Sequence, residues 1–285
     1  MEALLRSSMS SLRSQTSKMA DILETIADHN RLLVREAKEI ISSAEMTDLG
    51  LTAGGIRKAD GRDNLFEKEL AKEGMSFICE CKKASPSKGL IAPDFPYLQI
   101  AKEYEEAGAS AISVLTEPKW FMGSIAYLEE IAKEVSVPCL RKDFVIDEYM
   151  IYEASARGAS AVLLIASILD SKTFGKYMSI ADSLGLSVLA EAHNEEEVRM
   201  VIGEGARVVG VNNRNLRDFT VDPSNCLRLR QIVGDDALFV AESGIKSHDD
   251  IMVLADNKVD AVLIGESVMR AEDKKAFIRN LRDGQ

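Results

Sequence analysis

Short apolar runs recur along the chain at intervals of roughly 20 to 35 residues, and each has the composition of a buried strand. Eight runs fit this description: Phe77–Cys81, Ala111–Leu115, Pro138–Leu140, Ala161–Ile165, Ser187–Glu191, Val208–Val211, Leu238–Ala241 and Ala261–Ile264. Most of the segments between them place apolar residues at helical spacing, namely Tyr97–Glu106, Tyr127–Glu134, Asp147–Ala156, Phe174–Ser183, Glu195–Ile202 and Asp249–Leu254. Strands and helices that alternate in this way predict a parallel sheet covered by helices.

Glycine ends the segment before the second, fourth and sixth runs, at Gly108, Gly158 and Gly205. It is favoured there because it adopts the left-handed conformation that closes a helix at little cost. Eight similar units with this internal repeat predict a single closed (β/α)8 TIM barrel, α/β in class, of about 210 residues. An open doubly wound sheet is the alternative, but it usually carries a G-x-G-x-x-G turn after the first strand, which this sequence lacks.

The chain before the first strand predicts two helices and an irregular link. Apolar residues in Met19–Ala37 follow the spacing of an amphipathic helix that packs on the main body. Met46–Asp63 is rich in glycine and polar residues and predicts an ordered or mobile connection, and Phe66–Lys72 predicts a short helix. We therefore expect one domain overall, with residues 1–72 as an N-terminal arm and helices that pack on the barrel, and residues 73–285 as the barrel.

Composition and charge limit the partners and the compartment. The chain has 46 acidic and 35 basic side chains, and its net charge of −11 repels nucleic acid and anionic membranes. An anionic ligand must therefore meet a local cluster of cations. Cys79, Cys81, Cys139 and Cys226 are too scattered for a disulfide framework, which favours a reducing, cytoplasmic location. Residues 1–18 are basic and rich in serine, so a targeting segment, a frayed arm and a later start codon are all open interpretations.

Polar side chains stand at the carboxyl ends of the predicted strands, where TIM barrels carry their chemistry. In the first strand Glu80 and Lys82 share a parity and point inward, whereas Cys79 and Cys81 face the helices. The other candidates at strand ends are Lys142, Glu191, Asn212, Arg214, Glu242 and Ser243. A ring of structural ion pairs would use similar residues, but a buried lysine is costly unless something uses it.

Two loops that contain glycine predict an anion site. Ser243-Gly244-Ile245 and Gly265-Glu266-Ser267 follow the seventh and eighth predicted strands, where TIM barrels often hold phosphate near a helix N-terminus. Glycine lets the backbone approach a phosphate oxygen closely, although ordinary turn glycines are the alternative. The loop 83–89, which contains Ser85, is long enough to fold over a bound ligand, with a plain surface loop as the alternative.

Several of these segments resemble the motifs of one family. They are Ile78-Cys79-Glu80-Cys81-Lys82-Lys83-Ala84-Ser85-Pro86-Ser87-Lys88-Gly89, Val114-Leu115-Thr116-Glu117, Leu140-Arg141-Lys142-Asp143-Phe144, Gly210-Val211-Asn212-Asn213-Arg214-Asn215-Leu216 and Ala241-Glu242-Ser243-Gly244-Ile245. Together they are similar to indole-3-glycerol phosphate synthase, a (β/α)8 enzyme of tryptophan biosynthesis. That family converts 1-(2-carboxyphenylamino)-1-deoxyribulose 5-phosphate to indole-3-glycerol phosphate with loss of CO2 and water, so the resemblance implies a decarboxylating carbon–carbon lyase.

The resemblance implies roles for the residues at the barrel top. Lys142 would protonate the ribulose carbonyl, with a pKa that desolvation and a neighbouring cation lower toward working pH. Glu191 would act as general base or orient the leaving hydroxyl, and Glu80 and Lys82 would assist dehydration, with either lysine as its driver. Asn212 belongs to this catalytic set as a ligand of substrate polar groups. The implied binding residues are Arg214, Glu242, Ser243, Gly244, Gly265, Glu266, Ser267 and Ser85, with Phe121, Phe144 and Leu216 against the aromatic ring.

The resemblance also implies that no metal or organic cofactor takes part, because ring closure creates the cationic iminium that accepts electrons. His29, His193 and His248 are far apart in sequence and are predicted to be structural or solvated. The expected partner is a small anionic substrate, with a monomer as the default and association with other tryptophan-pathway enzymes left open.

Two other functions remain as alternatives. Phosphoribosylanthranilate isomerase has a similar fold and ligand. It would require a cysteine that points inward at the end of the first strand and an aspartate in the place of Asn212. A non-catalytic paralogue that binds a sugar phosphate would be marked by loss of an acid or base. The sequence keeps Glu80, Lys82, Lys142 and Glu191, so it favours the synthase.

Overall fold

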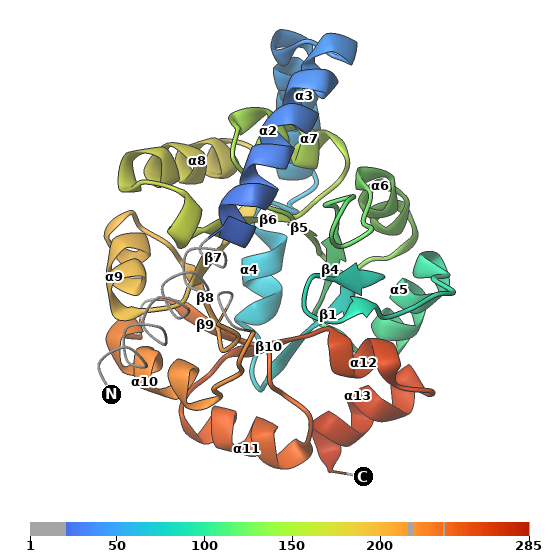
Figure 1. Ribbon diagram of the computed structural model, residues 1–285, viewed down its shortest axis with the longest axis vertical. Helices are drawn as coiled ribbons and strands as arrows, with labels where there is room; N and C mark the ends of the chain where they lie inside the picture. The colour runs from blue at the N-terminus through green and yellow to red at the C-terminus, as the bar shows by residue number, and fades with distance from the viewer. Residues whose placement is uncertain (1–20, 216–218, 236, 285) are drawn as a thin grey trace, which may run out of the picture.

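The computed structural model describes residues 21–215, 219–235 and 237–284. In this part of the chain, eight parallel strands close into a barrel in the order β1-β10-β9-β8-β7-β6-β5-β4, and helices surround it (Figure 1). The barrel strands are β1 (Ser76–Cys81), β4 (Ala111–Leu115), β5 (Cys139–Lys142), β6 (Ala161–Ile165), β7 (Ser187–Ala192), β8 (Val208–Asn212), β9 (Leu238–Glu242) and β10 (Ala261–Ile264). Each overlaps one of the predicted runs, so the predicted (β/α)8 barrel is confirmed.

The connecting helices lie on the outside of the barrel. They are α5 (Tyr97–Glu106), α6 (Ile125–Glu134), α7 (Glu148–Ala156), α8 (Ser171–Ser183), α9 (Glu195–Gly203), α10 (Ser224–Val233), α11 (His248–Asp256), α12 (Glu266–Arg270) and α13 (Lys274–Asp283), with a 3-10 turn η1 (Ala166–Ile168). Some begin earlier than predicted because a polar side chain caps the first turn. Asp170 accepts a hydrogen bond from the N–H of Thr173, so α8 begins at Ser171. No helix among the described residues is both long and apolar enough to cross a membrane.

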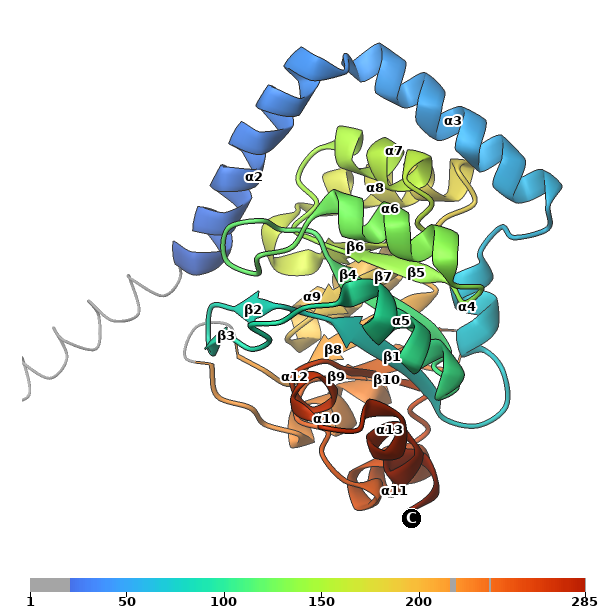
Figure 2. The same ribbon diagram turned by 90° about the vertical axis from the view of Figure 1, so that its right-hand side faces the viewer.

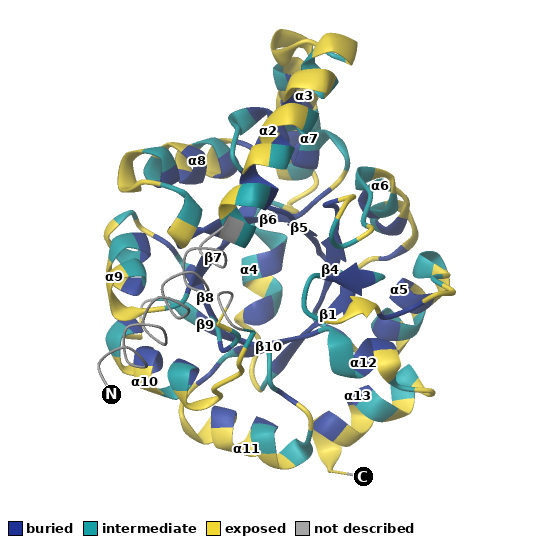
Figure 3. Ribbon diagram, in the orientation of Figure 1, coloured by how far each residue is buried: buried dark blue, intermediate teal, exposed yellow. Residues whose placement is uncertain are grey.

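Side chains alternate along each strand between the helices and the barrel interior. In β1, Phe77 and Cys79 pack in the layer between sheet and helices, whereas Ile78 belongs to the interior cluster. Leu189 and Val240 add apolar side chains to that cluster from β7 and β9. The strands are accordingly buried along their lengths, as Figure 3 shows. The lower barrel is therefore a filled core rather than a pore.

Between residue 21 and the first strand the structure has three helices, α2 (Asp21–Ile40), α3 (Ser43–Ala59) and α4 (Leu65–Leu70). Figure 2 shows α2 and α3 as a bent arm above α7 and α8, with α4 at the opposite end of the barrel from the start of α2. Phe66 and Leu70 of α4 are fully buried in the interior cluster. The two predicted helices are confirmed, whereas the connection predicted over Met46–Asp63 is wrong because α3 occupies most of it. The division at residue 72 into arm and barrel stays a prediction.

The glycines of α3 serve close packing rather than flexibility. A Cβ on Gly50 would lie 2.8 Å from Tyr152 O, and one on Gly54 would lie 2.9 Å from Leu184 O. Both glycines are buried, Gly50 where α3 crosses α7 and Gly54 beside Leu184 at the end of α8. The hydroxyl of Ser155 also donates a hydrogen bond to Gly50 O at 2.8 Å. A composition typical of a loop therefore belongs here to a helix that lies very near its neighbour.

Two alanine substitutions in α3 test this packing. Gly50→Ala should lower the free energy of unfolding by about 1–3 kcal/mol, since the new methyl group overpacks against the backbone of Tyr152. Gly55→Ala should raise it by about 0.5–1 kcal/mol, because no described atom lies within 4 Å of a Cβ there and alanine favours the helix. Urea unfolding followed by circular dichroism compares both variants with the parent, and equal midpoints for the two variants would contradict the packing explanation.

Candidate active site

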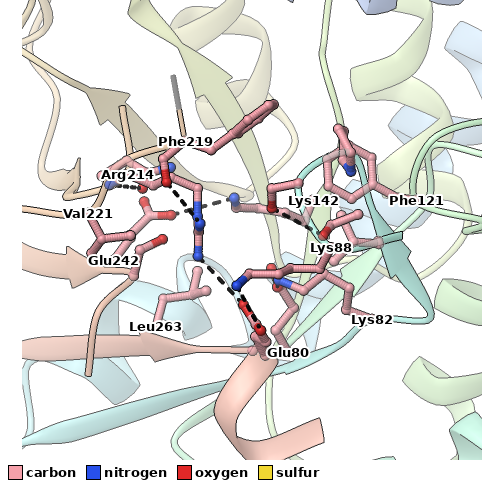
Figure 4. A pocket seen from close by; sticks show the side chains of 18 of the residues that line it. Glu80, Lys82, Lys88, Phe121, Lys142, Arg214, Phe219, Val221, Glu242 and Leu263 are labelled. Carbon is pink, nitrogen blue, oxygen red and sulfur yellow. Dashed lines mark hydrogen bonds and ion pairs between the residues drawn. The ribbon is translucent and has the colours of Figure 1, made fainter. Parts of the chain in front are cut away.

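A cavity of about 560 Å³ opens at the carboxyl ends of the barrel strands (Figure 4). Its lining contains these predicted site residues: Glu80, Lys82, Ser85, Phe121, Lys142, Phe144, Glu191, Asn212, Arg214, Glu242, Ser243, Gly244, Gly265, Glu266 and Ser267. The remaining predicted residue, Leu216, lies outside the described residues. The fold thus brings every described member of the predicted set to one cavity, although these residues are distant in sequence.

Four ionisable side chains share one layer of the barrel at this cavity: Glu80 on β1, Lys142 on β5, Glu191 on β7 and Glu242 on β9. They come from alternate strands around the barrel, as expected for a single layer of inward-pointing side chains. Lys142 Nζ lies 3.3 Å from Glu191 Oε2 and 3.5 Å from Glu242 Oε2. One buried ammonium therefore stands between two carboxylates.

The expectation that a neighbouring cation lowers the pKa of Lys142 is wrong. Burial does favour the neutral amine, but the carboxylates of Glu191, Glu242 and Glu80 outweigh it and raise the pKa of Lys142 above its usual range. The second lysine, Lys82, is paired instead with Glu80, with its Nζ 2.5 Å from Glu80 Oε1. Lys142 is therefore a charged ammonium at neutral pH that carries a proton to donate.

The two carboxylates that flank Lys142 have opposite pKa shifts. Burial raises the pKa of Glu242 to about 8, and the charges of Glu191 and Glu80 add to this effect against the ammonium of Lys142. Burial acts on Glu191 in the same direction, but Lys142 and His193 outweigh it and hold the pKa of Glu191 well below its usual range. Glu191 is therefore ionised near neutral pH, whereas Glu242 keeps its proton there.

Two glycines leave room for this charged layer. A Cβ on Gly210 would lie 2.3 Å from Glu242 Oε1. A Cβ on Gly265 would lie 2.3 Å from Glu80 Oε1 and 2.9 Å from Lys82 Nζ. The absence of a side chain at Gly265 is thus required by an ion pair of the protein itself, which the sequence did not indicate. Whether a phosphate also approaches the backbone of Gly265 stays a prediction.

Cations gather around Glu266 at one end of the cavity. Lys88 Nζ and Arg214 Nη2 each lie 3.6 Å from a carboxylate oxygen of Glu266, at the first residue of α12. Ser243 and Gly244, which also line the cavity, have left-handed φ angles of 66° and 89°. A left-handed serine is uncommon and is found mostly in tight turns and functional loops. An anion at this end would meet positive side chains despite the acidic character of the whole chain.

A small hairpin borders the cavity. The loop after β1 forms two short antiparallel strands, β2 (Ala84–Ser85) and β3 (Gly89–Leu90). Ser85 lines the cavity, and Lys88 at the turn reaches the carboxylate of Glu266. The loop predicted over residues 83–89 is therefore part of the cavity wall, and its closure over a ligand stays a prediction.

The other end of the cavity is apolar. The rings of Phe121 and Phe144 lie 6.1 Å apart between centroids, and both line the cavity. Asn30 on α2 donates hydrogen bonds of 2.9 Å to Asp143 Oδ1 and to Phe144 O, which fixes the backbone just after β5. Ile22, Leu23 and Ile26 of α2 also line the cavity. The spacing of apolar residues predicted that this helix packs on the main body, but it did not indicate a place at the cavity.

Comparison with known proteins identifies the family. The family model described as indole-3-glycerol phosphate synthase matches residues 23–281. The chain belongs to the indole-3-glycerol phosphate synthase family. The indole-3-glycerol phosphate synthase of Ruminiclostridium cellulolyticum is 56% identical over 217 residues, which cover 76% of this chain and 84% of that relative. The enzyme of that name from Lachnoclostridium phytofermentans is 48% identical over 263 residues, which cover 92% and 97%.

The family match confirms the resemblance inferred from the motifs and supports neither alternative function. Among solved structures, 3-hexulose-6-phosphate synthase from Salmonella typhimurium has a TM-score of 0.61, covering 73% of this chain and 97% of that chain. Its sequence identity is 16%, so this likeness shows the barrel fold alone.

His193, which contacts a residue of the charged layer without lining the cavity, was not among the predicted site residues. Of the three histidines, His29 meets the ring of Trp120 edge-on at 5.2 Å, and His248 Nδ1 lies 2.9 Å from a backbone oxygen of α13. His193, in contrast, has its Nε2 3.3 Å from Glu191 Oε1. The sequence did indicate that these two side chains could be close. His193 follows Glu191 by two residues, and side chains two residues apart along a strand point to the same side.

Proposed function

We propose that this cavity closes the indole ring, converting 1-(2-carboxyphenylamino)-1-deoxyribulose 5-phosphate to indole-3-glycerol phosphate, CO2 and water. The observation that carries the proposal is the buried ammonium of Lys142 between Glu191 and Glu242. This group lines a cavity that has an aromatic wall and a cationic end. A substrate with an aromatic acid at one end and a phosphate at the other has the matching chemistry.

The first step needs an acid. As the ring carbon that bears the carboxylate attacks the ribulose carbonyl, Lys142 donates its proton to the carbonyl oxygen and produces a hydroxyl group. The attack leaves a positive charge on the ring system, shared with its nitrogen as an iminium. Electrons of the bond to the carboxylate then neutralise that charge, so CO2 leaves and the aromatic ring is restored.

The second step removes water. One group must protonate the departing hydroxyl, and another must take a proton from the neighbouring carbon to form the indole double bond. Glu191, ionised by Lys142 and His193, is assigned as the base. Lys82, paired with Glu80 at 2.5 Å, is another lysine that lines the cavity beside this layer and is assigned to the hydroxyl. Asn212 Nδ2 donates to Glu191 Oε1 at 3.4 Å and helps to orient it.

The ends of the cavity hold the ends of the substrate in this proposal. The aromatic acid packs between Phe121 and Phe144, and the phosphate lies near Lys88, Arg214 and the backbone of Gly244. Gly265, Glu266 and Ser267 complete the predicted phosphate contacts at the start of α12. The proposal includes a monomer in the cytoplasm, in keeping with the four free, buried cysteines.

A fluorescence assay tests the function. The purified chain, mixed with 1-(2-carboxyphenylamino)-1-deoxyribulose 5-phosphate, should produce indole emission that grows with time and with enzyme concentration. The same protein should leave phosphoribosylanthranilate unchanged. Thermal protection by the first compound without any indole product would instead favour a non-catalytic binder, and turnover of phosphoribosylanthranilate would favour the isomerase.

A further inference from the structure

His193 lies between two carboxylates and outside the cavity lining. Its Nε2 is 3.3 Å from Glu191 Oε1, and its Nδ1 is 3.2 Å from Glu197 Oε2 on α9. Glu197 also accepts the backbone N–H of His193 at 2.7 Å and the side-chain amide of Asn194 at 2.7 Å. The imidazole is thus hydrogen-bonded through Nδ1 and lies within ion-pair distance of Glu191 through Nε2, with Glu197 itself held at the first turn of α9.

The surroundings of this ring favour its charged form. An imidazole that faces a carboxylate at each nitrogen needs a proton on both, which is the imidazolium. Burial opposes that charge, but Glu191 and Glu197 outweigh it and raise the pKa of His193 to about 10. From α10, the neutral side-chain amide of Asn225 donates a hydrogen bond to His193 O at 3.3 Å. The ring is therefore cationic throughout the neutral pH range.

Glu191 consequently has a cation on each of its oxygens. Lys142 Nζ lies 3.3 Å from Oε2, and His193 Nε2 lies 3.3 Å from Oε1. The ionised carboxylate of Glu80 opposes the ionisation of Glu191, and Glu242 adds a second negative charge only above a pH of about 8, where it loses its proton. Lys142 is assigned to give up its proton during the reaction, so at that moment it no longer supplies the charge that keeps Glu191 ionised.

We propose that His193 and Glu197 form a positioning pair that holds Glu191 ionised and oriented while Lys142 is deprotonated. The proposal rests on the function assigned above, because the need for an ionised Glu191 comes from its role as base. His193 acts through Glu191 and does not itself line the cavity. Glu197 supplies the countercharge that keeps the imidazolium in place from the side away from the substrate.

Two variants test the pair. His193→Gln should lower kcat by about 10- to 100-fold, in the range typical of outer residues that orient a reactive group, with a smaller change in KM. The acidic limb of the kcat/KM profile should move up by about one pH unit, because loss of an adjacent cation raises the pKa of Glu191. Glu197→Gln should shift the acidic limb in the same direction but by a smaller amount. The glutamine amide can still contact the imidazole, but it lacks the negative charge that stabilises the imidazolium. His248→Gln should match the parent, because His248 does not line the cavity and contacts the backbone of α13 instead.

The outcomes separate this inference from the proposed function. If Glu191→Gln is inactive while His193→Gln keeps the kcat and the pH profile of the parent, the positioning pair is overturned and the proposed base stands. If Glu191→Gln is fully active, the assigned base fails. A fall in kcat for His193→Gln without a shift of the acidic limb would show a merely structural role and also overturns the pair. Should His193→Gln not fold, the shift or constancy of the limb in Glu197→Gln decides.

Discussion

Lys142→Met is expected to lower kcat for ring closure by about 10²- to 10⁴-fold, the range that a positioned general acid contributes. Methionine keeps much of the length of the side chain but removes the ammonium that lies 3.3 Å from Glu191 Oε2 and 3.5 Å from Glu242 Oε2. The ribulose carbonyl then has no proton donor as the ring carbon attacks, so the first bond does not form at a useful rate. The initial rate of indole fluorescence at saturating substrate measures the effect.

A surface lysine gives the matched control. Lys133 on α6 has a side chain that is 67% exposed and is paired with Glu129, so Lys133→Met should leave kcat unchanged. Circular dichroism and thermal unfolding check that Lys142→Met is folded, because loss of the ammonium leaves the buried carboxylate of Glu191 without this partner, which is destabilising. Undiminished turnover by a folded Lys142→Met protein would refute Lys142 as the acid.

Glu191→Gln is expected to lower kcat by a similar factor of about 10²- to 10⁴-fold, because an amide of nearly the same shape cannot accept a proton. A second effect follows from the charges of the layer. Lys142 loses one of the three carboxylates that raise its pKa, so that pKa falls. Because Lys142 must be protonated to act, the residual activity should be lost at a lower alkaline pH than in the parent. The pH dependence of kcat between neutral and alkaline buffers measures both effects.

The neighbouring helix offers a control for Glu191→Gln. Glu196 is exposed on α9, and Glu196→Gln changes the net charge equally without touching the cavity. It should reproduce the kcat and the alkaline limb of the parent. An unchanged alkaline limb in Glu191→Gln would mean that Lys142 is not coupled to Glu191 in solution, and equal kcat values for Glu191→Gln and Glu196→Gln would remove Glu191 from the mechanism.

The barrel and the membership of its site could be predicted from the sequence because both depend on local periodicity. Alternating parity placed Glu80 and Lys82 inward and Cys79 outward, and the structure agrees. Each polar residue at a strand end then reaches the same opening, since parallel strands all end at one side. The motifs added the family, which the match over residues 23–281 confirms.

The charge state of the site could not be predicted in the same way. It depends on which inward side chains share a layer, and Lys142, Glu191 and Glu242 meet only because the closed barrel brings alternate strands together. Similarly, the glycines of α3 gave no sign of a helix, because their reason is the nearness of Tyr152 across a tertiary contact. Composition reports what a segment can do locally, whereas these two features depend on partners that are distant in sequence.

Because the lower barrel is filled, substrate and products can enter and leave the cavity from one side only. Ile78, Leu189 and Val240 fill the barrel interior below the charged layer, and Phe66 of α4 is buried in the same apolar cluster. No route through the cylinder exists among these packed side chains, so the opening at the carboxyl ends of the strands must also serve as the exit. Carbon dioxide, water and indole-3-glycerol phosphate therefore have to depart on the same side from which the next substrate arrives.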